Sequence, residues 1–174
     1  DENTLITELQ SFPLNDKEAT LPAYQKRTLD TNKLLKSFSS YKKSIRNDEA
    51  SILPESFFYS NDAIKPDGTK VVQAMVHLAQ LNILDLETGH VSGYRLEGEP
   101  DFSVFKSDEK IKSYFTRVQA DDNYIYAVYW GKERWERFET PHMNIIHVYD
   151  WDGNLVQKIE TDYSIGQMWI DPIR

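Results

Sequence analysis

Residues 114–162 constrain the fold more than any other part of this chain. They hold four runs rich in aromatic and β-branched residues, separated by breaks rich in Asp, Asn and Gly, and the runs span residues 114–120, 124–130, 144–150 and 155–160. Such runs, bounded by turn residues, are typical of short β-strands. Four consecutive strands joined mostly by tight turns predict an antiparallel meander. A single sheet of this kind needs a partner to cover its faces.

The same pattern recurs earlier in the chain. A turn at residues 64–68 corresponds to one at 120–123, so that Asp67 and Asp122 lie 55 positions apart, and an Asp closes the third run of each unit at Asp85 and Asp150. A weaker copy covers residues 24–38, and a partial one covers 168–172. A period of roughly 40–50 residues with four strands per unit predicts a β-propeller. The alternative is a β-sandwich of about eight strands, which has similar turn spacing.

The repeat predicts an all-β propeller fragment of about three four-stranded antiparallel blades. Its expected parts are a partial blade, a blade, a crossover loop, a second blade and the first strand of another blade, over residues 1–55, 56–97, 98–112, 113–161 and 162–174. The chain begins at Asp1 and ends soon after a strand-like run. We therefore expect it to be a processed protein or a piece of a longer one. Open sheet edges would favour self-association.

Composition narrows the functional classes. The 174 residues carry a formal net charge of -8, with 40% hydrophobic and 13% aromatic residues, so a packed core is expected and a general nucleic-acid binder is not. The chain contains no run of eighteen apolar residues, so no membrane span is predicted. The chain has no cysteine, hence no disulfide and no thiol nucleophile.

Several motifs together resemble the TolB-like six-bladed β-propeller proteins of Bacteroides-type bacteria. They are Pro66-Asp-Gly-Thr-Lys-Val-Val72, Leu81-Asn-Ile-Leu-Asp-Leu-Glu-Thr-Gly89, Asp101-Phe102 after a Gly-Glu-Pro, Ala120-Asp-Asp-Asn-Tyr-Ile-Tyr-Ala127 and His147-Val-Tyr-Asp-Trp-Asp-Gly-Asn-Leu155. The resemblance covers about residues 20–174. It implies a six-bladed ring of which this chain holds about the C-terminal half. It also implies export, as a periplasmic or lipid-anchored outer-membrane protein. It transfers no catalytic residue.

Because strand direction alternates within an antiparallel blade, the short turns should lie at one face of a propeller and the long connections at the other. The long connections are residues 97–112 and 131–144. Binding residues are often carried by long loops on a rigid scaffold. The second of these loops is the richest in candidates. Aromatic side chains there suit a sugar or a peptide, and cationic ones suit an anionic group; the predicted binding residues are Trp130, Arg134, Trp135, Phe138 and His142. The alternative is a solvated loop whose rings pack back on the blade.

Other chemistry finds little support in the sequence. The Asp150–Asn154 turn departs from a calcium loop in its Gly position and lacks the required bidentate Glu. The four histidines lack metal-ligand spacing, and there is neither a nucleophile elbow nor a Gly-rich phosphate loop, so no metal or cofactor is predicted. The repeated carboxylates are interpreted as turn caps, and they are Asp85, Asp101, Asp121, Asp122 and Asp150.

Three functional readings remain. The first is a non-catalytic exported propeller that binds a protein or glycan partner, or acts as a scaffold, through the long-loop face. The second is a propeller hydrolase or lyase that acts on a glycan or lactone at the ring axis, with catalytic residues that the sequence does not identify. The third is a half-ring completed by a second chain. An axial cluster of polar side chains or a bound metal would favour the enzyme, and an aromatic patch would favour binding.

Overall fold

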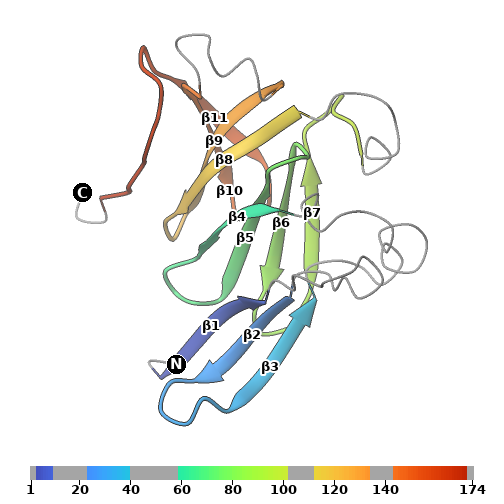
Figure 1. Cartoon of the computed structure of the whole chain (residues 1–174), viewed down its shortest axis with the longest axis vertical. Coiled ribbons are helices and arrows are strands. Elements are labelled where there is room, and N and C mark those ends of the chain that lie inside the picture. The colour runs from blue at the N-terminus through green and yellow to red at the C-terminus, as the bar shows by residue number, and fades with distance from the viewer. Residues whose placement is uncertain (1–2, 10–22, 40–58, 102–111, 134–142, 172–174) are drawn as a thin grey trace.

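Three antiparallel sheets make up the structure, a computed structural model that describes residues 3–9, 23–39, 59–101, 112–133 and 143–171 (Figure 1). These residues contain eleven strands and no helix. The predicted all-β architecture of about three antiparallel sheets is therefore confirmed. A β-sandwich would instead have placed its strands in two sheets.

Strand bounds follow the alternation of the sequence closely. The N-terminal sheet contains β1 (Thr4–Leu9), β2 (Ala23–Thr28) and β3 (Leu34–Ser39) in the order β1-β2-β3. The central sheet has the order β4-β5-β6-β7 and contains β4 (Ser60–Ile64), β5 (Lys70–Met75), β6 (Gln80–Asp85) and β7 (Val91–Arg95). The C-terminal sheet has the order β11-β10-β9-β8 and contains β8 (Lys112–Ala120), β9 (Tyr124–Glu133), β10 (Ile145–Asp150) and β11 (Leu155–Glu160). Each is a meander, as predicted. The assignment of the sheets to successive blades of a ring stays a prediction.

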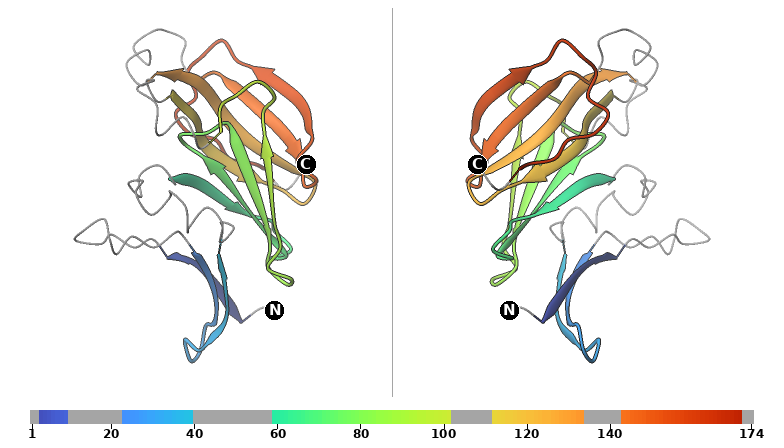
Figure 2. Two further views of the ribbon diagram at one scale, coloured as in Figure 1. Left: turned by 90° about the vertical axis from the view of Figure 1, so that its right-hand side faces the viewer. Right: turned by 90° about the vertical axis from the view of Figure 1, so that its left-hand side faces the viewer.

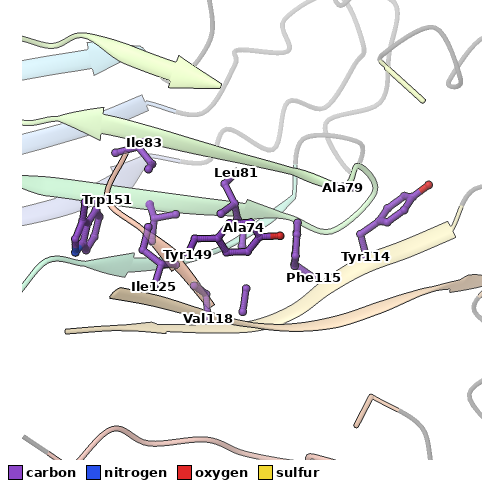
Figure 3. Close-up of a cluster of buried hydrophobic side chains, with 12 residues drawn as sticks. Ala74, Ala79, Leu81, Ile83, Tyr114, Phe115, Val118, Ile125, Tyr149 and Trp151 are labelled. Carbon is purple, nitrogen blue, oxygen red and sulfur yellow. The ribbon is translucent and has the colours of Figure 1, made fainter. Parts of the chain in front are cut away.

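The sheets pack face to face, with the central sheet between the other two (Figure 2). One core joins Tyr24 and Phe38 of the N-terminal sheet to Val71 and Leu84 of the central sheet. A larger core joins the opposite face of the central sheet to the C-terminal sheet, and its members include Ala74, Leu81, Ile83, Phe115, Val118, Ile125, Tyr149 and Trp151 (Figure 3). The central strands β5 and β6 are consequently buried on both faces, which explains their nearly continuous apolar runs.

Aspartates cap the short turns. Asp85 Oδ1 accepts hydrogen bonds from the N–H groups of Glu87 and Thr88, and Asp150 Oδ1 accepts from those of Asp152 and Asn154. The bonds from Thr88 lower the pKa of Asp85. Such side chains satisfy backbone donors that a turn leaves unpaired. This supports the interpretation of these two carboxylates as structural groups.

Within each four-stranded sheet, the two short turns lie at the same end of the strands and are tied together. Leu86 N donates to Thr69 O across the two turns of the central sheet (2.8 Å). Trp151 Nε1 donates to Asp121 O across those of the C-terminal sheet (3.1 Å). The connections β7–β8 and β9–β10 leave from the opposite ends of the strands, which we call the long-connection end. Of these connections, residues 102–111 and 134–142 lie outside the described residues.

The segment after β11 differs from the expected first strand of another blade. Residues 161–171 form no strand, and Trp169 in this segment is 78% exposed. A strand needs a hydrogen-bonded neighbour, and the part of the chain that the structure describes places no strand beside this segment. The assignment of residues 162–174 to the first strand of another blade stays a prediction.

The N-terminal sheet carries several exposed leucines. Leu5, Leu34 and Leu35 are 43–48% exposed on this sheet, where no further described sheet covers them. Such positions are compatible with self-association, which stays a prediction. Within the described ranges, no helix has the length and hydrophobicity needed to cross a bilayer.

Candidate functional site

Buried polar residues gather in one half of the sheet stack. Among the described residues, four polar side chains are at least nine-tenths buried, and they are Gln73, Gln80, Asn82 and His147. Each lies in the half of its strand that is nearer the long-connection end. The opposite half contains apolar side chains such as Val71, Leu84 and Ile125. Because buried polar groups are costly unless they are paired, this asymmetry identifies the long-connection end as the candidate site.

A polar row crosses the central sheet on the face turned towards the N-terminal sheet. Strand register places Asp62 of β4 opposite Gln73 of β5, and Gln73 opposite Asn82 of β6. From the N-terminal sheet, the Tyr24 hydroxyl donates to Asp62 Oδ2 (2.5 Å). Burial raises the pKa of the Asp62 carboxyl, although hydrogen bonds from Ser60 and Tyr24 oppose the shift. We call Tyr24, Asp62, Gln73 and Asn82 the polar row.

A hydrogen-bonded chain continues the polar row towards the edge of the sheet. Arg95 Nη2 donates to Gln80 Oε1 (3.2 Å), and Gln80 Nε2 donates to Asn82 Oδ1 (2.7 Å). Gly93 pairs with Asn82 in the neighbouring strand, and a Cβ at Gly93 would lie only 3.3 Å from Gln80 Nε2. The missing side chain at Gly93 thus leaves the room that the two amides occupy.

A second polar cluster lies between the central and C-terminal sheets. Glu99, on the crossover after β7, accepts hydrogen bonds from the hydroxyls of Tyr114 (2.9 Å) and Tyr129 (3.4 Å). The ring of His147 stacks on that of Tyr129 with centroids 4.3 Å apart, and His147 Nδ1 lies 3.1 Å from the Tyr149 hydroxyl. These contacts fix the crossover against the C-terminal sheet. We call Glu99, Tyr114, Tyr129, His147 and Tyr149 the aromatic cluster.

The aromatic cluster keeps its histidine neutral. Desolvation, together with the nearby charge of Lys158, lowers the pKa of His147 to about 4. The imidazole is therefore uncharged near neutral pH and acts as a packing and hydrogen-bonding group. A lowered pKa in the folded state also makes stability depend on pH.

We expect His147 to make folding sensitive to acid. The unfolded chain binds a proton at His147 near pH 6.5, whereas the folded chain does so only near pH 4, so the stability present above 6.5 is lost as pH falls towards 4. The loss between about pH 7 and pH 4.5 should be about 2 kcal/mol. Urea denaturation at both pH values should show a smaller loss for His147→Gln than for the original chain. His90→Gln, at an exposed turn position, is the matched control, and an unchanged loss in His147→Gln would contradict the assignment.

The predicted binding residues have different positions. Trp130 lies at 7% exposure on the face of the C-terminal sheet that points away from the central sheet, with Lys132 Nζ 5.4 Å from its ring centroid. Arg134, Trp135, Phe138 and His142 lie outside the described residues. β9 continues to Glu133, so residues 131–133 belong to a strand and not to the expected loop. The binding hypothesis for this loop stays a prediction, with Trp130 as a buried residue at its base.

The polar row and the aromatic cluster were not predicted as sites from the sequence. One signal was present, because Gln73, Gln80 and Asn82 interrupt otherwise apolar runs that resemble strands buried on both faces. Polar residues in such runs need partners inside the protein. The contribution of Glu99 had no comparable signal, since its partners come from strands that follow a long connection.

The structure consists of three stacked antiparallel meanders. Within the two four-stranded sheets, capped turns lie at one end of the strands and long connections leave from the other end. This arrangement defines a β-propeller type of protein. The sequence profile of a family described as TolB-like 6-blade propeller-like matches residues 14–172, and the chain belongs to this family. A search of curated proteins gave no significant match.

Proposed function

We propose that this chain is a non-catalytic propeller protein that binds a protein or glycan partner at the long-connection end. One observation carries the proposal: all four of the described, deeply buried polar side chains lie in that half of the sheets. The short-turn end is occupied by aspartate-capped turns that satisfy their own backbone donors. Polar groups held by a rigid scaffold are the usual basis of a specific binding surface.

The family match supports a further part of the proposal, which is that the protein works outside the cytoplasm. The connection between β9 and β10 supplies the proposed contact residues. Arg134 and Trp135 suit a sugar ring or an acidic peptide, because a guanidinium can bind an anionic group and an indole can stack.

A glycan array and a peptide array, each screened with purified protein, test the proposal. We expect Trp135→Ala and Arg134→Ala to reduce any specific binding by about tenfold, as removal of one well-placed contact does. Asp122→Ala and Thr88→Ala, at the short-turn end, are the matched controls and should leave binding unchanged. Loss of binding in the controls alone would contradict the location. Conversion of a bound glycan or lactone into a product would favour a hydrolase or lyase instead.

A further inference from the structure

Two acidic side chains meet in the contact between the N-terminal and central sheets. Glu8 of β1 lies opposite Tyr24 of β2 in strand register, so both side chains project from the same face of the N-terminal sheet. That face packs against the central sheet, because Tyr24 belongs to the shared core and donates to Asp62 on β4. The Asp62 carboxyl also accepts a hydrogen bond from the side chain of Glu8. The two carboxyl groups therefore touch across the two sheets.

A hydrogen bond between two carboxyl groups requires a proton. An ionised carboxylate only accepts, whereas a protonated carboxyl has an O–H donor. The Tyr24 hydroxyl occupies Asp62 Oδ2, and Asp62 Oδ1 is a buried atom that takes no hydrogen bond from an N–H group or hydroxyl in the described part of the chain. A proton on Glu8 makes this residue the donor to Asp62. A proton also needs no cavity between the side chains, in contrast to a water molecule.

Burial makes a second negative charge costly at this contact. Desolvation is the largest cause acting on Asp62, and it raises the pKa of this carboxyl. Hydrogen bonds from Ser60, Tyr24 and Glu8 favour the ionised form and oppose the shift. Two ionised carboxylates in contact repel each other, so a pair of this kind retains one proton to a higher pH than an isolated acid does. The negative charge then belongs to Asp62 and the proton to Glu8.

Other charged groups on the two facing surfaces do not replace the proton. Strand alternation places three cations on these surfaces, and they are Lys26, Lys36 and Arg95. Lys36 donates to a backbone carbonyl of the β6–β7 turn, and Arg95 donates to Gln80. The neighbouring strands contribute uncharged side chains, with Phe38 opposite Tyr24 and Gln73 opposite Asp62. Among the described residues, the groups that shift the pKa of Asp62 are two hydroxyls and the Glu8 carboxyl.

We propose that Glu8 and Asp62 share one proton near neutral pH and form a pH-sensitive contact between the N-terminal and central sheets. With the proton present, Glu8 donates to one oxygen of Asp62 and Tyr24 donates to the other. Loss of the proton leaves two negative charges in contact, so the N-terminal sheet is held less tightly as pH rises. The contact does not depend on partner binding at the long-connection end.

The sign of the pH dependence is opposite to that of His147. A raised pKa means that the folded chain holds a proton that the unfolded chain has released. The stabilisation is therefore complete below the unfolded pKa of about 4 and is lost as pH rises through the folded pKa. His147 instead destabilises the contact between the central and C-terminal sheets as pH falls. The two sheet contacts thus respond to pH in opposite directions.

NMR titration of the side-chain carboxyl carbons in isotope-labelled protein tests the shared proton. We expect Glu8 Cδ to keep the chemical shift of a neutral carboxyl at about pH 6, where an ordinary Glu is ionised. Asp67, on an exposed turn, is the internal control, since a hydrogen bond from Lys65 lowers its pKa to about 2. Ordinary titration of both Glu8 and Asp62 near pH 4 would overturn the proposal.

The same spectra recorded with calcium distinguish a proton from a metal ion. We expect millimolar calcium to leave the signals of Glu8 and Asp62 unchanged. A saturable shift of both signals, with both groups ionised, would place a cation between them and overturn the proposal.

Glu8→Gln keeps a donor of similar shape but removes the proton that titrates. In urea denaturation, the folding equilibrium constant of the original chain should fall relative to that of Glu8→Gln by about tenfold per pH unit between the unfolded and folded pKa values. Glu160→Gln, at an exposed position of β11, is the matched control, and its ratio to the original chain should not vary with pH. The contribution of His147 cancels, because all three proteins contain it.

A ratio for Glu8→Gln that stays constant across this pH range would overturn the proposal. If Glu8→Gln does not fold, the carboxyl titration of the original chain decides. Hydrogen exchange locates the effect: compared with Glu8→Gln at the same pH, the amides of β2 should lose protection as pH rises, and those of β10 should lose less. An equal loss in both strands would show that the effect does not arise at this contact.

Discussion

Replacement of Phe115 by alanine is expected to lower the free energy of unfolding by about 4 kcal/mol. The Phe115 ring is completely buried in the core between the central and C-terminal sheets (Figure 3). Its ring centroid lies 5.8 Å from that of Tyr129 and 6.4 Å from those of His147 and Tyr149. Removal of the ring leaves a cavity that three aromatic neighbours can only partly fill, and it withdraws edge contacts from each of them.

Urea denaturation with tryptophan fluorescence measures this loss. Phe115→Leu retains most of the volume and should lose far less stability, about 1 kcal/mol. Leu155→Ala removes a side chain that is 38% exposed and should lose less than about 1 kcal/mol. A loss below about 1 kcal/mol in Phe115→Ala would mean that the two sheets do not share this core.

Phe115 also links the innermost strands. The Asn61 side-chain amide on β4 donates to the Phe115 carbonyl on β8 (3.0 Å), and Tyr114 N donates to Val76 O (2.7 Å). β8 is thus joined to β4 by a side-chain-to-backbone hydrogen bond, and to the residue that follows β5 by a backbone hydrogen bond. This is why one side chain should influence the stability of both sheets.

The strands and turns could be predicted because they depend on local sequence. The runs at residues 124–130 and 155–160 correspond to β9 and β11, and Asp85 and Asp150 end the third strand of their sheets as predicted. β-branched and aromatic residues between turn formers specify such strands without reference to distant parts of the chain.

The candidate site could not be predicted in the same way, because it depends on register and on which faces meet. Asp62, Gln73 and Asn82 share a row only if β4, β5 and β6 pair in one register, and a shift by one residue would turn a side chain to the opposite face. Tyr24, which donates a hydrogen bond to Asp62 in this row, belongs to another sheet and lies 38 positions before Asp62 in the chain. The segment at residues 168–171 shows the converse, since its local pattern resembles a strand but the structure forms no strand there.

Replacement of Gly153 by alanine is expected to lower the free energy of unfolding by about 3 kcal/mol, from two separate causes. Gly153 has φ of +83°, which costs an alanine about 1 kcal/mol of backbone strain. An added Cβ would also lie 2.2 Å from Cγ of Tyr94, a ring on the neighbouring sheet, so the turn or the ring must move. Forced overpacking of this kind typically costs about 1–3 kcal/mol.

Gly68→Ala separates the two causes, and this makes the Gly153 prediction a test of how the sheets pack. Gly68 has a similar φ of +71°, but an added Cβ there meets no atom within 4 Å, so only the backbone strain of about 1 kcal/mol is expected. In chemical denaturation, Gly153→Ala should therefore be about 2 kcal/mol less stable than Gly68→Ala. Tyr94→Ala combined with Gly153→Ala should recover part of that difference, as coupled neighbours do. Equal losses in the two single variants would show that the β10–β11 turn does not approach β7. Because Gly153 meets the outermost strand of the central sheet while Phe115 lies beside the innermost strands, the two substitutions together test the contact between these sheets at both ends.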